Sequence, residues 1–261
     1  MSGRFDISID TRGVARLTVA HDAKLNTLNP ALLDAATATL HDLAKQRDLR
    51  AAVLTGEGGR AFIGGADIGA MAALNTPAEA EDFIRRIHGI CAAIRDLPVP
   101  VIARINGWCL GAGLEVAAAC DMRIAVREAK FGMPEVRVGI PSVVEAALLP
   151  GLIGWGRTRR LLLLAETISA AEALGWGLLE EVAHRERIDA RIEAWIDNLL
   201  AAGPEAIRLQ KSLIRQWEDR PISEAIAVGI TAFGASWKTD EPKRMMRAFL
   251  EEQKKERKKE P

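Results

Sequence analysis

Short apolar segments alternate with longer amphipathic ones over the first half of the chain. The predicted strands cover residues 5–10, 14–19, 51–55, 98–105 and 122–126, and the predicted helices cover residues 30–47, 77–96 and 113–120. Thr11-Arg12-Gly13 is typical of a hairpin, whereas Asn29-Pro30 and Thr76-Pro77 suit helix N-termini. The glycine-rich residues 56–69 are predicted to form a loop. This alternation predicts an α/β fold with a mainly parallel sheet.

Beyond Ser142 the pattern becomes almost wholly helical. Two apolar stripes have helical spacing: Ile188, Ile192, Trp195, Ile196 and Leu199, then Ile222, Ile226, Ile230, Phe233 and Trp237. For both stripes, packing in the core or between subunits is favoured over a cofactor site. Because no repeat and no linker rich in Ser or Pro is found, the helical end is predicted to pack on the same unit.

Composition narrows the classes of protein. The 261 residues are 49% hydrophobic and 27% charged, which suits one sizeable core and excludes the charge bias of a disordered chain. The 35 basic and 35 acidic residues cancel, so no global field attracts nucleic acid or an anionic membrane. The longest uncharged stretch, residues 225–237, is too short for a transmembrane helix, and residues 1–6 lack the apolar core of a secretion signal.

Cysteine usage indicates the compartment. Cys91, Cys109 and Cys120 are odd in number, have apolar neighbours and show no metal-ligand spacing. They are therefore predicted to be reduced thiols in a cytoplasmic protein. The mixed charges of residues 251–261 are typical of a solvated helix end.

Two glutamates carry the strongest chemical signal. Glu115 ends the glycine-rich segment 107–115, and Glu135 ends Phe131-Gly132-Met133-Pro134-Glu135. Their apolar or glycine-rich flanks predict poorly solvated positions, where burial favours the protonated carboxyl group. Such a pair suits a general acid and a general base.

Other common types of site find little support. The glycine spacing in residues 107–113 fits neither the dinucleotide fingerprint nor the P-loop. None of the four histidines, His21, His41, His88 and His184, pairs with another at metal spacing. We therefore predict no metal site and no histidine-based triad.

Several motifs together resemble the enoyl-CoA hydratase/isomerase (crotonase) superfamily. They are Ala23-Lys24-Leu25-Asn26-Thr27-Leu28, Ala61-Phe62-Ile63-Gly64-Gly65-Ala66-Asp67-Ile68 with Met71, Asn106-Gly107-Trp108 through Glu115, Cys120-Asp121, Phe131 through Glu135 with Gly139, Glu166 through Ala173, and Gly177-Leu178-Leu179. The resemblance covers nearly the whole chain in order. It implies a spiral of ββα units over residues 1–190 and a helical region over residues 191–261 that commonly forms trimers and hexamers.

The resemblance also implies roles for individual residues. The backbone N–H groups of Ala66 and Ala112 would form an oxyanion hole for the thioester oxygen, and Glu115 and Glu135 would be the two catalytic acids. Substrate or coenzyme A contacts would come from Lys24, Leu25, Gly64, Gly65, Asp67, Ile68, Gly111, Pro134, Gly139, Ser142 and Glu145. Lys24 is a candidate for the phosphates, and an ordinary solvated lysine is an equal alternative.

The segment after Gly139 departs from the common hydratase pattern. The usual glycines are replaced in Ile140-Pro141-Ser142-Val143-Val144-Glu145, so the preference for acyl length or substituents is predicted to differ. Glu145 has three open roles: catalysis, binding of a polar acyl group, or a solvent-facing or structural position. The last is favoured.

The implied function is enoyl-CoA hydration in fatty acid metabolism, the reversible addition of water to a 2-enoyl-CoA. It needs no metal or redox cofactor, because coenzyme A enters with the substrate thioester. Two acids favour hydration over double-bond isomerisation, which is the alternative enzyme activity. A non-catalytic acyl-CoA-binding or assembly protein is the alternative of another class. The identity of the acyl group stays open.

Overall fold

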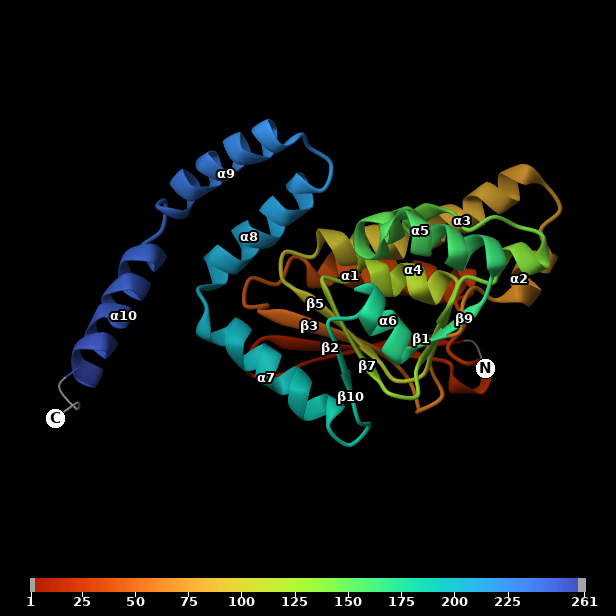
Figure 1. Ribbon diagram of the computed structural model, residues 1–261, viewed down its shortest axis with the longest axis horizontal. Helices are drawn as coiled ribbons and strands as arrows, with labels where there is room; N and C mark the ends of the chain where they lie inside the picture. Colours follow the sequence, from red (N-terminus) through yellow and green to blue (C-terminus); the bar gives the residue numbers. More distant parts are fainter. Residues whose placement is uncertain (1–2, 258–261) are drawn as a thin grey trace. The chain divides into compact units, whose positions relative to one another are not determined.

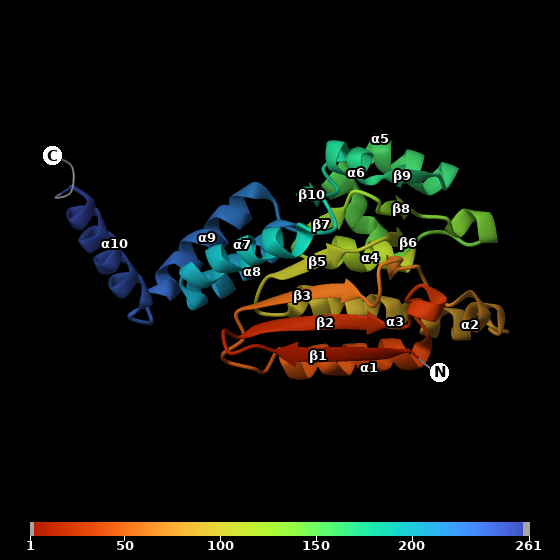
Figure 2. The ribbon, with the colours of Figure 1, turned by 90° about the horizontal axis from the view of Figure 1, so that it is seen from below.

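The computed structural model describes residues 3–257 and contains two sheets (Figures 1 and 2). The larger sheet has the order β1 (Arg4–Ile9), β2 (Val14–Ala20), β3 (Ala51–Gly56), β5 (Val101–Ile105), β7 (Met122–Val126) and β10 (Glu181–Ala183). The smaller sheet has the order β4 (Ala61–Ile63), β6 (Trp108–Leu110), β8 (Lys130–Gly132) and β9 (Thr167–Ser169). Only the β1–β2 and β8–β9 pairs are antiparallel among these strands, so the prediction of a mainly parallel α/β protein is confirmed.

Ten α-helices accompany the sheets in the described part of the chain. They are α1 (Pro30–Leu43), α2 (Ile68–Ala72), α3 (Pro77–Asp96), α4 (Ala112–Ala119), α5 (Leu149–Leu164), α6 (Ala170–Trp176), α7 (Ile188–Ala201), α8 (Pro204–Trp217), α9 (Ile222–Ser236) and α10 (Glu241–Arg257). Three 3-10 helices are η1 (Asp22–Lys24), η2 (Glu135–Val138) and η3 (Val144–Leu148). None of the helices within residues 3–257 is long and apolar enough to cross a membrane.

A repeated connection generates the two sheets. After β3 and after β5, the chain adds one short strand to the smaller sheet and then forms helix, giving β3–β4–α2 and β5–β6–α4. These units confirm the predicted ββα repetition. The turn into each helix brings its N-terminus to the end of a short strand, and this junction positions the site described below.

Local signals explain most of the element boundaries. The Asn29 side chain accepts the Leu32 N–H at 2.9 Å, and the Thr76 hydroxyl accepts the Glu79 N–H at 3.2 Å, so both predicted N-caps form. The helix that begins at Pro30 ends at Leu43 and not near Arg47 as predicted.

Most of the differences from prediction concern three-residue strands. β4 and the start of α2 occupy the predicted loop 56–69, and β9 and β10 interrupt the region that was predicted to be almost wholly helical. Such strands are too short to establish a period of two in the sequence. Their pairing in the sheets, which is a tertiary feature, defines them. The prediction for residues 98–105 was also too long, because β5 starts at Val101 after two prolines.

Of the described residues, those up to Ile196 form one compact unit and those from Asp197 onward form a second. The helical end therefore forms a unit of its own, and its packing on the first unit stays a prediction. In the first unit, α1 and α3 pack against each other, and Leu33 and Ile87 are fully buried there. The first stripe belongs partly to this core, because Ile188, Ile192 and Ile196 are all buried.

The second unit contains a different apolar surface. α8 and α9 pack together, yet the second stripe stays exposed on α9. Ile222, Ile226, Ile230, Phe233 and Trp237 have exposed fractions of 79%, 60%, 71%, 71% and 45%. Packing in the core of this chain therefore does not explain this stripe, and packing between subunits stays a prediction.

Candidate active site

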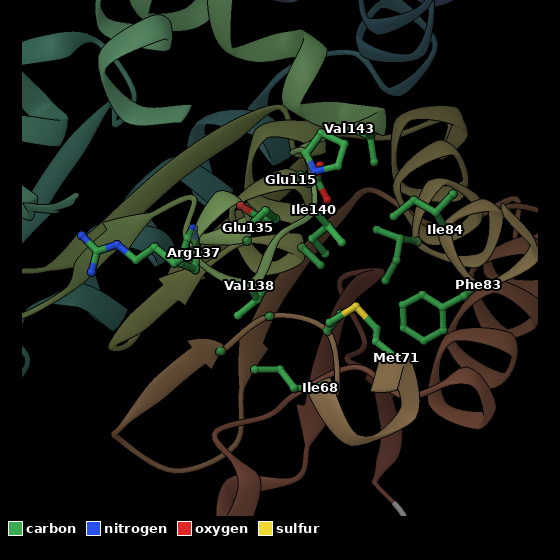
Figure 3. Close-up of a pocket in the computed structure, with 18 residues that line it drawn as sticks. Ile68, Met71, Phe83, Ile84, Glu115, Glu135, Arg137, Val138, Ile140 and Val143 are labelled. Atoms are coloured by element: carbon green, nitrogen blue, oxygen red, sulfur yellow. The ribbon is translucent and has the colours of Figure 1, made fainter. Parts of the chain in front are cut away.

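A cavity of about 210 Å³ lies where the smaller sheet meets α2, α3 and α4 (Figure 3). Glycine-rich backbone and two glutamates form one part of its wall, and apolar side chains form the rest. The lining residues are Gly64, Gly65, Ala66, Ile68, Met71, Phe83, Ile84, Ile87, Gly111, Ala112, Glu115, Pro134, Glu135, Arg137, Val138, Ile140, Pro141 and Val143. Both predicted catalytic glutamates therefore line the same cavity.

Glu115 lies in the first turn of α4 and is only 4% exposed. Its Oε1 atom accepts a hydrogen bond from the Ala146 N–H at 3.3 Å. Burial raises the pKa of Glu115 to about 8, and the negative charges of Glu135 and Glu145 also raise it. At neutral pH this carboxyl group therefore holds its proton.

Glu135 begins the 3-10 helix η2 and is partly buried. Burial raises its pKa, whereas a hydrogen bond of 2.8 Å from the Ser142 hydroxyl to Oε2 favours the ionised form. A Cβ atom at Gly111 would lie 2.3 Å from Oε1 of Glu135. Since Gly111 also has a φ of +51°, a glycine at this N-cap lets the carboxyl group approach the turn into α4.

The two carboxyl groups are not neutralised by cations. Within residues 3–257, neither Glu115 nor Glu135 forms an ion pair with Lys, Arg or His. Arg137 lines the cavity wall, but Figure 3 shows its side chain extending away from both glutamates. The charge of Glu135 helps to raise the pKa of Glu115, so the two acidic groups act on each other in one poorly solvated site, which suits acid–base chemistry.

The two predicted oxyanion donors also lie on the cavity wall. The Leu28 N–H donates to the Gly65 carbonyl at 2.9 Å, and the Leu28 carbonyl accepts the Asp67 N–H at 2.8 Å. In this parallel bridge the intervening N–H of Ala66 points away from Leu28. Ala112 is the first residue of α4, and an N–H at that position has no acceptor within its own helix. Ala66 and Ala112 thus line the same cavity as the two glutamates, and their role as donors stays a prediction.

The predicted coenzyme A residues divide into two groups. Gly64, Gly65, Ile68, Gly111 and Pro134 line the cavity, whereas Lys24, Leu25, Asp67, Gly139, Ser142 and Glu145 do not. Lys24 and Leu25 nevertheless lie close to the wall, because the Gly64 N–H donates to Leu25 at 2.8 Å and the Lys24 ammonium is 3.1 Å from Asp67.

Asp67 is the N-cap residue of α2. It caps α2 by accepting the Ala70 N–H at 3.0 Å, and this bond, with the one from Lys24, lowers the pKa of Asp67. The early loop and the Ala66 loop are thereby joined.

Glu145 occupies an unexpected position. It is 6% exposed, so the solvent-facing alternative is wrong. Its Oε1 atom lies 2.8 Å from Nδ1 of His88 on α3, a histidine for which the sequence suggested no role. Its Oε2 atom has no hydrogen-bond partner among the described residues.

Sequence reasoning also missed much of the apolar wall. Phe83, Ile84 and Ile87 line the cavity from one face of α3, and Val143 also lines it. Their spacing of three and four residues was the available signal, but it predicts any buried helix face equally well. A second cavity of about 670 Å³ shares Ile68, Met71, Phe83, Ile84, Val138, Ile140, Pro141 and Val143 with the first and continues beyond it.

Metal ligands and reactive thiols do not gather at this site. No group of three or more His, Cys, Asp or Glu side chains in the described part of the chain is arranged to hold a metal ion. Cys91 and Cys109 are fully buried free thiols, and burial raises their pKa well above the ordinary value. They are therefore poor nucleophiles.

Comparison with known proteins identifies the family. The sequence model of the enoyl-CoA hydratase/isomerase family matches residues 10–259, so the chain belongs to this family. It is 34% identical over 242 residues to a short-chain-enoyl-CoA hydratase from Clostridium acetobutylicum, with 92% of each chain covered. It is 35% identical to a crotonyl-CoA hydratase from Syntrophomonas wolfei, covering 92% of this chain and 93% of the relative.

Solved structures give the same result. The crystal structure of an enoyl-CoA hydratase from Mycobacterium smegmatis superposes with a TM-score of 0.92 at 30% identity, covering 95% of this chain and 96% of the other. This chain thus has the same fold as that enoyl-CoA hydratase over nearly all of its length. The matching fold includes the two-sheet core that places Glu115 and Glu135 in one cavity.

Proposed function

We propose that this protein is an enoyl-CoA hydratase that adds water reversibly across the 2,3 double bond of a 2-enoyl-CoA thioester. The observation that carries this proposal is the pair of poorly solvated carboxyl groups, Glu115 and Glu135, on the wall that also presents the amides of Ala66 and Ala112. Hydration requires one group to accept a proton from water, another to supply a proton to carbon, and donors for a developing enolate.

The mechanism uses the carboxyl groups as a pair. At neutral pH the raised pKa of Glu115, about 8, keeps one proton in the pair, and the Ser142 hydroxyl favours ionised Glu135. A water between them gives a proton to the ionised member as its oxygen bonds to C3. The electron pair of the C2–C3 double bond moves to form an enolate on the thioester oxygen.

Ala66 and Ala112 stabilise this enolate through their N–H groups. One such donor contributes roughly 3 to 4 kcal/mol to the transition state, judged from donor removal in other enzymes. The protonated carboxyl group then supplies its proton to C2, and the enolate electrons return. No metal or redox cofactor enters these steps, and coenzyme A stays attached to the product.

Oxygen labelling tests the reaction directly. A panel of 2-enoyl-CoA thioesters is incubated with the protein in water enriched in heavy oxygen, and the products are analysed by mass spectrometry. A hydratase places the label on C3, whereas an isomerase moves the double bond without incorporating it. Binding of acyl-CoA without turnover of any thioester would instead support the non-catalytic alternative.

The apolar wall indicates an apolar acyl group. Beyond the glutamates the cavity continues into the larger space lined by Met71, Phe83 and Ile84, which offers no charged group to a polar substituent except Glu81 at its edge. Thioesters with longer aliphatic or aromatic acyl groups are therefore expected to react with a higher kcat/KM than crotonyl-CoA. A steady fall of kcat/KM with acyl length would contradict this assignment.

The coenzyme A portion is assigned to the surface around Lys24, next to the loop that contains Ala66. Lys24 lies beside Asp67 and next to the Ala66 loop, and its side chain is 60% exposed, so a phosphate can reach its ammonium group. Lys24→Gln is expected to raise KM with little change in kcat, because the contact is the same in the substrate and the transition state.

We also propose that the protein is a cytoplasmic homo-oligomer, with the exposed α9 stripe as an interface. A row of large apolar side chains of this size on one helix is typical of a contact surface. Analytical ultracentrifugation of Ile230→Asp tests this assignment, with Thr231→Asp as the control, because Thr231 is exposed and lies about 100° around α9 from Ile230. Dissociation of the first variant alone supports the interface, and a monomeric wild type contradicts it.

A further inference from the structure

The turn over residues 143–146 is held in an unfavourable backbone conformation. Val144 has a φ of +39°, in the left-handed region that β-branched residues rarely adopt. Such a residue persists only where the surrounding contacts compensate for the strain, and strained backbone is frequent at functional sites. The contacts of the next two residues explain what holds the turn.

Two contacts tie this turn to two different helices. The Glu145 carboxyl group meets Nδ1 of His88 on α3 at 2.8 Å. The following N–H, from Ala146, donates to Oε1 of Glu115 on α4 at 3.3 Å. The 3-10 helix η3, which contains both Glu145 and Ala146, packs against α3, α4 and α5. The peptide unit that contacts a proposed catalytic acid is thus anchored by the adjacent His88–Glu145 pair.

The surroundings of Glu145 also give its charge an influence on Glu115. On the α3 side, Glu145 meets His88 and acts on the Cys91 thiol. Its charge also acts on Glu115 of α4, as does the charge of Glu135 in η2. α5 has no titratable side chain before Arg157, which donates to the Trp176 carbonyl. His88 therefore provides the one cationic partner, when its ring is protonated, among the described groups packed around Glu145.

We infer that Glu145 and His88 form a positioning pair for Glu115: they hold the strained 143–146 turn so that the Ala146 amide meets the carboxyl group, and they set the charge beside it. This inference rests on the proposed hydratase function of Glu115. His88 connects the pair to solvent, because its side chain is 58% exposed whereas that of Glu145 is 7% exposed. Neither residue touches the substrate in this assignment.

The charge effect is tested with Glu145→Gln, which keeps the shape and removes the charge. The Glu115-dependent limb of the kcat/KM profile is expected to move to lower pH, by less than the rise that burial causes, because a like charge next to a carboxyl group disfavours its ionisation. Arg85→Gln, an exposed change on α3, is the control and should leave the profile unchanged. A lower rate with no movement of the limb would overturn the charge effect.

The positioning effect is tested by relief of the strain. His88→Ala is expected to lower kcat about tenfold, since misplacing a catalytic group is costly. Val144→Gly in that background should recover part of the loss, because glycine adopts a φ of +39° without strain. Ala147→Gly, at an exposed position without positive φ, should recover none. Equal behaviour of the two glycine variants would overturn the positioning effect.

A readout without turnover separates this inference from the proposed function. Glutamate carboxyl carbons are labelled with 13C, and the Glu115 signal is assigned by its loss in Glu115→Gln. Its titration midpoint should fall in Glu145→Gln even if no thioester is hydrated by the wild type. Absence of hydration with a moving midpoint refutes the hydratase proposal alone, whereas a fixed midpoint refutes the pair. If Glu145→Gln does not fold, the His88→Ala midpoint, expected to change, decides the question.

Discussion

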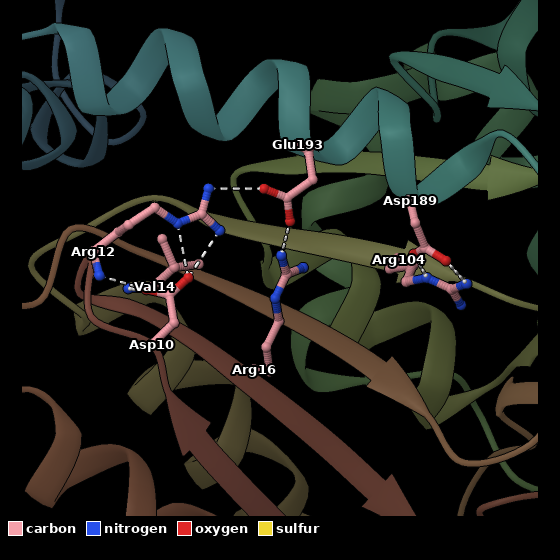
Figure 4. A network of polar contacts seen from close by, with 7 residues as sticks. All are labelled: Asp10, Arg12, Val14, Arg16, Arg104, Asp189 and Glu193. Carbon is pink, nitrogen blue, oxygen red and sulfur yellow. Dashed lines mark hydrogen bonds and ion pairs between the residues drawn. The ribbon is translucent and has the colours of Figure 1, made fainter.

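Two groups of carboxylates in the first unit have opposite environments. Glu115 and Glu135 lie in the cavity without a cationic partner, and burial raises both pKa values. Asp189 and Glu193 lie on α7 above the larger sheet, where they meet arginines of the strands and of the hairpin (Figure 4). The Arg104 guanidinium donates to Asp189 at 2.6 and 3.0 Å and lowers the pKa of that carboxyl group.

The comparison shows that a carboxyl group suits acid–base chemistry when no cation pairs with it. Arg12 and Arg16 both pair with Glu193, so this side chain serves to fix α7 on the sheet. Glu115 receives only a backbone N–H and stays available for proton transfer. A cation within a few ångströms would favour the charged form of Glu115 and make it a poor acid.

The largest expected effect comes from removing the unpaired carboxyl groups. Glu115→Gln and Glu135→Gln should each lower kcat for enoyl-CoA hydration by at least about 100-fold, because each loses one proton-transfer step. Asp189→Asn, from the paired group, should leave kcat unchanged. Steady-state hydration assays measure all three variants, and near-normal hydration by either glutamine variant would sink the two-acid mechanism.

The next effect concerns stability. Between the ordinary pKa of 4.5 and about 8, folded Glu115 holds a proton that the unfolded chain has released, so wild-type stability falls as pH rises. Glu115→Gln lacks this loss. The difference in free energy of unfolding between Glu115→Gln and the wild type should change by about 2 kcal/mol in favour of the variant from pH 5 to pH 7, since one pKa unit corresponds to about 1.4 kcal/mol. Urea titrations at fixed protein concentration test this, and parallel pH dependences would contradict it.

A cation placed in the cavity should give Glu115 the charged partner that Asp189 and Glu193 already have. Ile84 and Glu115 line the same wall, so Ile84→Lys is expected to lower the pKa of Glu115 by about one unit or more. Ile84→Met has similar length without charge and serves as the control. The 13C signal of Glu115 reports the change, and equal midpoints in both variants would show that the lysine does not act on this carboxyl group.

The smallest effect is expected at the paired group. The stabilisation that Asp189 gains from Arg104 is present above its ordinary pKa of 3.8 and is lost as pH falls through the lower value of the folded state. Because the side chain is 70% exposed, Asp189→Asn should cost less than about 1 kcal/mol at pH 7. Urea unfolding should show this difference shrinking at acid pH. A loss of several kcal/mol would place the pair among the main supports of α7.

Sequence reasoning reached different parts of the site with different success. Helix caps at Asn29 and Thr76 depend on neighbouring residues, so they were predictable. The resemblance to the family motifs also predicted that Glu115 and Glu135 belong to one site. The short strands β4, β6 and β8 were not found, because their pairing partners lie far along the chain.

The partners of charged groups were the least predictable feature. Nothing near Glu145 in the sequence points to His88, which is 57 residues away, and the positive φ of Val144 runs against the preference of its own side chain. The exposed stripe on α9 was equally ambiguous, since its spacing is that of any buried helix face. Long-range packing explains the position of Glu145 and the conformation of Val144, whereas the role of the α9 stripe stays a prediction.

Local conformational preference and short spacing were enough to predict the α/β alternation, the helix starts, and the short segments that end in Glu115 and Glu135. The tertiary structure decided that both carboxyl groups share a cavity without a cation, that Gly111 lets Glu135 approach the backbone, and that Glu145 is buried beside His88. The physical reason is that burial and charge pairing depend on which distant segments pack together, and the local sequence does not specify them.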